Sequence, residues 1–169
     1  IFGQLTSPHP RDDRKNIIKT IQLIRANFKD HEDVGVILKS NVGRSSIIDY
    51  KATQAVVTHA IKQVSEASGG IESNVKVNLI HGNFSDEILR DLYLNPKVKC
   101  LISLTRGEGF GLPVLESAAC GLPVIATKWS AYTDYMKGDS YLKVKYNLVP
   151  LSESRVDPNI FMAGAKWAE

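Results

Sequence analysis

The chain has 169 residues, of which 43% are hydrophobic and 23% charged, enough for a folded domain with its own core. Its 2 cysteines exclude a disulfide-held scaffold, and the short apolar runs exclude a membrane-spanning helix. A net charge of +3 is too small to indicate a nucleic-acid binder. Since no signal peptide precedes the first strand, we expect a cytoplasmic protein.

The first half of the sequence predicts alternating strands and helices. Short apolar runs predict buried strands, and apolar residues spaced three and four apart predict amphipathic helices. The expected strands cover residues 1–5, 34–38 and 76–80, and the expected helices cover residues 14–28 and 47–67.

The second half continues the alternation. A helix should follow Ser85, whose hydroxyl can cap it, and another should carry Pro113 in its first turn and Gly121 just beyond its end. The remaining strands are expected at 98–104, 124–127 and 141–149, with helices at 112–120 and 133–136.

Continuous apolar strands that alternate with helices predict a parallel sheet covered on both faces. The expected fold class is therefore α/β, a Rossmann-like doubly wound sheet, formed as one domain by residues 1–169. Ligands of such sheets bind beyond the carboxyl ends of the strands, so the loops there are where functional residues are expected.

The loop at 105–111 is the richest of these, because it places Gly107, Gly109 and Gly111 between a strand and a helix. Glycines allow a ligand to approach the backbone, and the first amides of a helix attract an anion. Leu112 and Val114 stand where a dinucleotide fingerprint would need its third glycine, so that motif does not fit.

Two carboxylates accompany this loop, Glu108 within it and Glu116 in the helix that follows. One interpretation makes Glu108 a solvated loop residue and Glu116 a favourable charge near a helix N-terminus. The other makes them sugar-binding groups, because a carboxylate can accept two hydroxyl hydrogen bonds.

Residues 106–127, which read RGEGFGLPVLESAACGLPVIAT, resemble the signature of the family 4 (group 1) glycosyltransferases. The segments at 14–16 and 80–88 agree more weakly. The resemblance implies that the chain is the C-terminal, donor-binding half of a GT-B fold, whose N-terminal acceptor domain lies outside it. It also implies glycosyl transfer from a nucleotide-diphosphate sugar to a hydroxyl acceptor, with retention of the anomeric configuration.

The resemblance further implies roles for single residues. Glu108 would contact the hydroxyls of the donor sugar, and Glu116 would hold the ribose hydroxyls. Lys15, helped by Arg14, would neutralise the diphosphate, so Glu108 and Lys15 are the residues expected to act in catalysis. Backbone groups of the loop would face the sugar and the diphosphate, namely those of Gly109, Phe110, Gly111 and Leu112.

Other donor contacts are expected at neighbouring strand ends. Backbone groups around Asn83 and Phe84 would meet the edge of the base. Lys39 could reach the cleft, although a single lysine at a strand end is as often a solvated charge.

Several positions depart from the family pattern, among them Lys39 and Ser40, where the family often has Gly-rich polar residues. Gln4 stands where the family commonly has an arginine, so either Arg11 or Arg14 supplies that charge or the site is weaker. The segment 129–134 replaces a usual Gly-Gly pair and carries Asp134 where glutamate is common. We expect this segment to border the cleft and to bear on the preference for the sugar or the acceptor.

The resemblance implies no cofactor and no metal, and the sequence contains no Asp-x-Asp motif to hold one. The implied partners are a nucleotide sugar and a glycan or lipid-linked acceptor, as in polysaccharide biosynthesis, with no nucleic acid. Peripheral membrane association of the full-length protein is left open. The alternatives are another GT-B-like enzyme, such as a phosphorylase or an epimerase, and a non-catalytic nucleotide-sugar-binding module.

Overall fold

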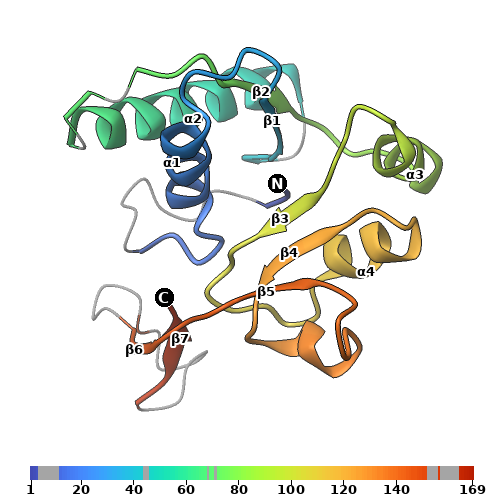
Figure 1. Ribbon diagram of the computed structural model, residues 1–169. Coiled ribbons are helices and arrows are strands. Elements are labelled where there is room, and N and C mark those ends of the chain that lie inside the picture. The colour runs from blue at the N-terminus through green and yellow to red at the C-terminus, as the bar shows by residue number, and fades with distance from the viewer. Residues whose placement is uncertain (4–11, 44–45, 68, 71, 152–155, 157–163) are drawn as a thin grey trace. The chain divides into compact units, whose positions relative to one another are not determined.

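The computed structural model describes residues 1–3, 12–43, 46–67, 69–70, 72–151, 156 and 164–169 (Figure 1). The chain forms two compact units, residues 1–83 and residues 84–169, and each is described by itself. Gln4 and Arg11, which bear on the expected diphosphate site, lie outside the described residues.

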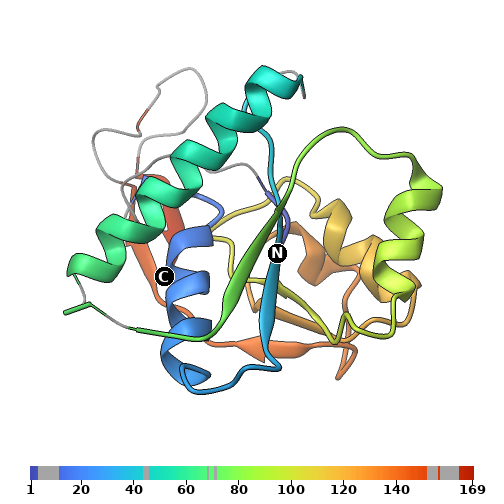
Figure 2. The ribbon, with the colours of Figure 1, turned by 90° about the horizontal axis from the view of Figure 1, so that it is seen from above.

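The first unit is built on two parallel strands, β1 (Gly35–Lys39) and β2 (Lys76–Ile80). Residues 1–3 lie parallel along the other edge of β1, through a bridge between Phe2 and Lys39. Two helices, α1 (Ile17–Asn27) and α2 (Ile47–Ala67), lie on the same side of the β1–β2 pair (Figure 2).

The core of the first unit lies between these helices and strands. Its buried members come from one face of each helix, from alternate positions of β1 and from the residue directly before β2. They are Ile17, Ile18, Ile21, Val36, Leu38, Val57, Ala60 and Val75. The carboxyl ends of β1 and β2 are thereby fixed next to each other, since the register pairs Lys39 with Ile80.

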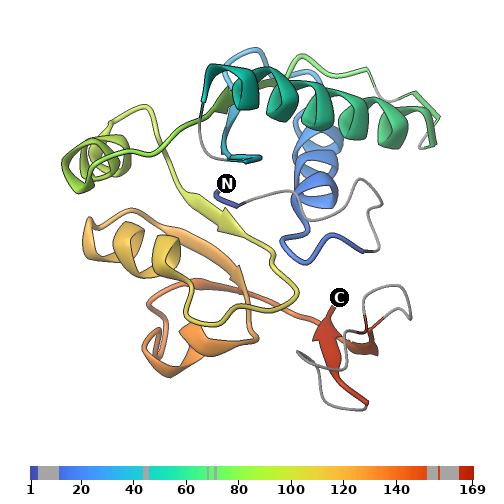
Figure 3. The same ribbon diagram turned by 180° about the vertical axis from the view of Figure 1, so that it is seen from behind.

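The second unit contains a parallel sheet in the order β3 (Leu101–Ser103), β4 (Val124–Thr127) and β5 (Leu142–Val144). Two helices, α3 (Asp86–Leu94) and α4 (Leu112–Ala119), pack against each other, and α4 also packs on β3 and β4 (Figure 3).

The rest of the second unit consists of shorter elements. The 3-10 helix η2 (Ala131–Asp134) follows β4, and the strands β6 (Leu148–Pro150) and β7 (Lys166–Ala168) pair antiparallel. The parallel sheets alternating with helices confirm the predicted α/β, Rossmann-like class.

Local sequence signals place several boundaries correctly. The helix over 47–67 and the strands over 76–80 and 124–127 have the predicted bounds. Ser85 caps α3 by accepting a hydrogen bond from the amide of Ile88, at 3.5 Å. Gly121 has a φ of +74°, the left-handed conformation expected beyond the end of α4.

The single strand predicted over 141–149 is wrong. It divides into β5 and β6, because the chain leaves the parallel sheet after Val144. Asn147 then exchanges two backbone hydrogen bonds with Glu169, at 2.7 and 2.8 Å. Pairing with a segment about 20 residues away leaves no pattern in the neighbouring residues. The strand β7 was therefore not predicted from the sequence.

The helix predicted from residue 14 begins later, at Ile17. Asn16 precedes it in a left-handed conformation, with a φ of +54°, and its side chain makes no capping bond. The carboxylate of Asp13 takes that role instead, since its Oδ2 accepts from the amide of Ile17 at 2.7 Å and its Oδ1 accepts from the amide of Lys15 at 3.3 Å. Asp13 therefore fixes the backbone that carries Lys15.

This arrangement predicts the effect of an Asp13→Ala substitution. Because the variant removes the acceptor of the buried Ile17 amide, the first of α1, we expect its free energy of unfolding to fall by about 1–2 kcal/mol. Equilibrium unfolding in urea measures this change.

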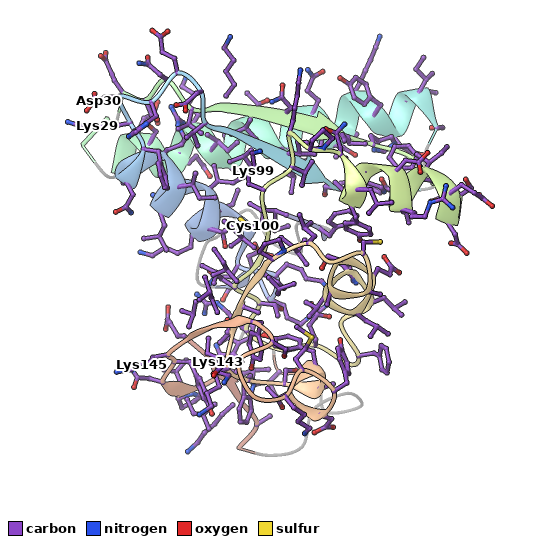
Figure 4. The ribbon with its side chains drawn as sticks, turned by 45° about the vertical axis from the view of Figure 1, so that its right-hand side comes forward. Lys29, Asp30, Lys99, Cys100, Lys143 and Lys145 are labelled. Carbon is purple, nitrogen blue, oxygen red and sulfur yellow. The ribbon has the colours of Figure 1, made fainter. Side chains whose placement is uncertain are left out.

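Asp30→Ala is the matched control, since Asp30 is exposed beside Lys29, as Figure 4 shows. A loss in Asp13→Ala no larger than that of the control would contradict the capping role.

Candidate functional site

The glycine loop connects β3 to α4 in the second unit, at the carboxyl end of the strand. Its last residue, Gly111, has a φ of +83°, and a Cβ there would lie 3.0 Å from Cδ1 of Tyr132. A Cβ on Gly107 or Gly109 would meet no atom of the described residues within 4 Å, their own chain neighbours aside. Within the described part of the chain, packing therefore requires glycine at Gly111 and not at the other two positions.

The start of α4 presents a row of backbone amides. Among the described residues, the amides of Gly109, Phe110, Gly111 and Leu112 donate to no other group of the chain. Pro113 follows within the first helical turn, where its missing N–H costs nothing. Unpaired amides at the positive end of a helix dipole are suited to bind an anion.

The segment after β4 holds this loop in place. The hydroxyl of Ser130 accepts from the amide of Glu108 at 2.6 Å and donates to the carbonyl of Glu108 at 2.7 Å. The hydroxyl of Tyr135 donates to the carbonyls of Phe110 and Gly111, at 2.8 and 3.0 Å. The sequence predicted that this segment borders the cleft but did not identify these contacts, because they join residues more than 20 positions apart.

Glu116 is oriented by the neighbouring helix. The hydroxyl of Tyr93, which is 3% exposed, donates to Oε2 of Glu116 at 2.9 Å. Among the described residues, Oε1 of Glu116 has no hydrogen-bond partner. The half-buried carboxylate is therefore fixed through one oxygen and leaves the other able to accept. Sequence reasoning placed Tyr93 on a helix but gave no sign of this role.

Arg106, the first residue of the resemblance segment, is buried and serves the packing of the second unit. Its Nη2 lies 3.1 Å from Oε1 of Glu169, and its guanidinium lies 4.9 Å from the ring centroid of Trp167. Its carbonyl accepts from the amide of Ala168 at 3.0 Å. These contacts attach β7 to the base of the glycine loop.

The predicted cationic residues belong to the first unit. The stem of Lys15 lies against Gly3, where a Cβ would come within 3.0 Å of Cγ of Lys15. The amide of Gly3 donates to the carbonyl of Lys39 at 3.0 Å. Lys15 therefore lies near the carboxyl end of β1. Arg14 is half-buried.

Lys39 is also half-buried, and its Nζ donates to Oδ1 of Asn41 at 3.2 Å. Burial lowers the pKa of the Lys39 ammonium from its ordinary value. Asn41 in turn accepts from the amide of Gly82 at 2.9 Å, which joins the segments after β1 and β2. Lys39 is thus held at this edge rather than extended freely into solvent.

His81, directly after β2, has a structural contact with Thr53. The Thr53 hydroxyl donates to the carbonyl of Asp49 at 2.7 Å and accepts from the amide of Val42 at 2.9 Å. Because that hydroxyl has one proton, already donated, His81 must donate from Nδ1 across the 3.1 Å contact.

The predicted site residues are distributed over both units. Arg14, Lys15, Lys39 and the exposed Asn83 belong to the first unit. The half-buried Phe84, the loop residues Glu108, Gly109, Phe110, Gly111 and Leu112, and Glu116 belong to the second. Along the chain, Glu108 directly precedes the four free amides and Glu116 follows them by four residues. The roles of all these residues toward a donor stay predictions.

The described residues contain no group of three or more His, Cys, Asp or Glu side chains that could hold a metal ion. The helices of these residues are each too short or too polar to span a bilayer.

The environment of Tyr93 predicts how stability depends on pH. Burial, and then the hydrogen bond to Glu116, raises the pKa of Tyr93 above its ordinary value of 10.0 in the folded chain. At pH values above 10 the unfolded chain releases a proton that the folded chain keeps, so the free energy of unfolding falls as the pH rises. This decline should be shallower in Tyr93→Phe.

Urea unfolding of both proteins at pH 8 and at pH 11 measures the two declines. Equal declines would show that Tyr93 ionises as readily in the folded chain as in the unfolded chain.

Comparison with known proteins shows what this chain is similar to. Three serotype-specific mannosyltransferases named WbdA, from Escherichia coli, are each 51% identical to it over 43 residues. The matched stretch is 25% of this chain but 5% of each relative, so the chain spans only a small part of their length.

A family model described as glycosyl transferases group 1 matches residues 61–147, about half of the chain. The matched range includes Asn83, Phe84, the glycine loop and Glu116, and it begins after Lys15 and Lys39. The chain belongs to the group 1 glycosyltransferase family.

Proposed function

We propose that this chain is the donor-binding part of a retaining glycosyltransferase, which uses a nucleotide-diphosphate sugar and transfers the glycosyl unit to a hydroxyl acceptor. Glycosyl transfer in general follows from the family. One observation carries the finer proposal: Glu108 and Glu116 flank four backbone amides that donate to no other described residue. Carboxylates for hydroxyls and amides for phosphate oxygens are the groups that such a donor requires.

The diphosphate is bound in this proposal by the amides of 109–112 and by the dipole of α4. The family resemblance, rather than any distance in the structure, assigns further positive charge at the diphosphate to Lys15, Arg14 and Lys39 of the first unit. As the bond to the sugar breaks, negative charge develops on the departing diphosphate. Preorganised amides and cations then stabilise the transition state more than the bound donor, which is how they accelerate the reaction.

The ribose is assigned to Glu116. A carboxylate can accept from both hydroxyls of a ribose, and the Tyr93 contact holds Oε2 while Oε1 has no partner among the described residues. The base edge is assigned to backbone groups around the neighbouring residues Asn83 and Phe84.

The donor sugar is assigned to Glu108. The hydroxyl of Ser130 holds the backbone of this residue through two hydrogen bonds. Because the similar Escherichia coli proteins are named as mannosyltransferases, a mannosyl donor is the first to test. The acceptor would be a glycan or a lipid-linked glycan, bound by a further domain. The full-length enzyme would act in the cytoplasm or at the membrane surface.

The proposed chemistry needs no metal, because lysine, arginine and backbone amides neutralise the diphosphate. We therefore expect transfer by the full-length protein to persist when EDTA is added. Transfer of a radiolabelled sugar, assayed with and without about 1 mM EDTA, measures whether the reaction depends on a metal. Loss of transfer that is restored by Mg²⁺ or Mn²⁺ would contradict the metal-free arrangement.

Glu116→Gln tests the proposed function itself. The amide keeps the size of the side chain but replaces one acceptor oxygen by a donor, so we expect the affinity for a nucleoside diphosphate to fall about 10-fold. Calorimetric titration with GDP and with UDP measures the change, and thermal unfolding checks that the variant folds.

Glu87→Gln is the matched control, since Glu87 is an exposed residue of α3 in the same unit. If the wild-type full-length protein bound no nucleoside diphosphate, the proposal that this chain binds the donor would be overturned. Unchanged affinity in Glu116→Gln would remove Glu116 from the ribose site.

A further inference from the structure

Ser130 has a backbone conformation that serine rarely adopts. Its φ is +90° and its ψ is −177°, in a region that is populated almost entirely by glycine. A serine that persists there is held by its surroundings, because the conformation itself is unfavourable. Interactions of the serine side chain, which glycine lacks, must therefore offset the cost of this backbone conformation.

The side chain of Ser130 makes contacts that compensate. Its hydroxyl accepts from the amide of Glu108 at 2.6 Å and donates to the carbonyl of the same residue at 2.7 Å. One hydroxyl thus satisfies both backbone groups of a single loop residue, 22 positions earlier in the chain. The hydroxyl-to-carbonyl distance is the ordinary one for such a bond, and the amide-to-hydroxyl distance is short.

The position of Ser130 is itself held by its neighbours. The Thr133 hydroxyl donates to the carbonyl of Ser130 at 2.7 Å. Two residues after Ser130, the fully buried Tyr132 donates from its hydroxyl to the carbonyl of Thr127 at 2.6 Å. The segment after β4 is therefore fixed at both sides of Ser130, so that the serine can restrain the loop rather than follow it.

We propose that Ser130 is a positioning residue, which fixes the backbone of Glu108 and thereby directs the Glu108 carboxylate toward the donor sugar. This rests on the proposed function, in which Glu108 contacts the sugar. Rotation of the peptide groups on either side of Glu108 would break one or both bonds to Ser130. The hydroxyl therefore restricts the directions in which the Glu108 side chain leaves the loop.

This role separates the sugar from the rest of the donor. Glu116 is held by Tyr93, and the end of the loop is held by Tyr135, both independently of Ser130. Loss of the Ser130 hydroxyl should consequently weaken contacts to the sugar while contacts to the ribose and the diphosphate persist. A merely structural serine would not discriminate between a nucleotide sugar and the free nucleoside diphosphate.

The experiment compares Ser130→Ala and Ser130→Gly with the wild type in the full-length protein. Glycine accepts the backbone conformation of this site without strain, so that variant keeps the test valid even where the alanine variant folds poorly. Calorimetry measures the affinities for GDP, UDP, GDP-mannose and UDP-glucose, and transfer assays give KM and kcat with the sugar donor that binds.

In both variants we expect the affinity for the nucleotide sugar to fall about 5-fold to 10-fold, as for loss of one or two ordinary hydrogen bonds. The affinity for the matching nucleoside diphosphate should stay within about 2-fold, and kcat should fall about 10-fold or more, because a misdirected Glu108 acts on the reacting sugar.

Ser117→Ala is the control, because the Ser117 hydroxyl donates to the carbonyl of Val114 within α4 and does not touch Glu108. It should leave the ratio of sugar-donor affinity to diphosphate affinity unchanged. If the ratio is also unchanged in Ser130→Ala and Ser130→Gly, whether or not both affinities fall, the positioning role is overturned while the proposed function stands. Absence of diphosphate binding by the wild type would instead remove the proposed function.

Discussion

A row of backbone amides at the start of α4 is the constraint on which the rest of the site depends. The first turn of a helix is where backbone N–H groups regularly have no acceptor within the chain. Within the described part of the chain, the amides of 109–112 remain available, and the open space beside Gly107 and Gly109 leaves room in front of them. An anionic ligand satisfies both features at once.

The remaining parts of the second unit maintain this arrangement. Tyr93 holds one oxygen of Glu116, Ser130 holds the backbone of Glu108, and Tyr135 holds the last two carbonyls of the loop. These contacts come from the helix before the loop and from the segment after the next strand. The two glutamates are thus positioned by tertiary contacts, whereas the free amides follow from local backbone geometry alone.

Much of the fold could be predicted because its causes are local. The capping hydroxyl of Ser85, the left-handed Gly121 and the apolar periodicity of α2 each act within a few residues. The division of 141–149 into two strands could not be predicted, since it depends on pairing of Asn147 with Glu169.

The candidate site shows the same distinction. Its glycines and glutamates were found through spacing and family resemblance, which fix residue types along the chain. Tyr93 and Ser130 were not, because a tyrosine on an amphipathic helix and a serine in a loop are ordinary in sequence. Only the folded chain shows that each donates to, or accepts from, a residue more than 20 positions away.

Nuclear magnetic resonance of the ¹⁵N-labelled protein, titrated with GDP and with UDP, tests the central claim most directly. If the free amides bind the diphosphate, the largest changes in amide chemical shift should fall on Gly109, Phe110, Gly111 and Leu112 and should saturate with the nucleotide concentration. Saturating changes confined to other parts of the chain, with these four amides unmoved, would contradict the proposed site.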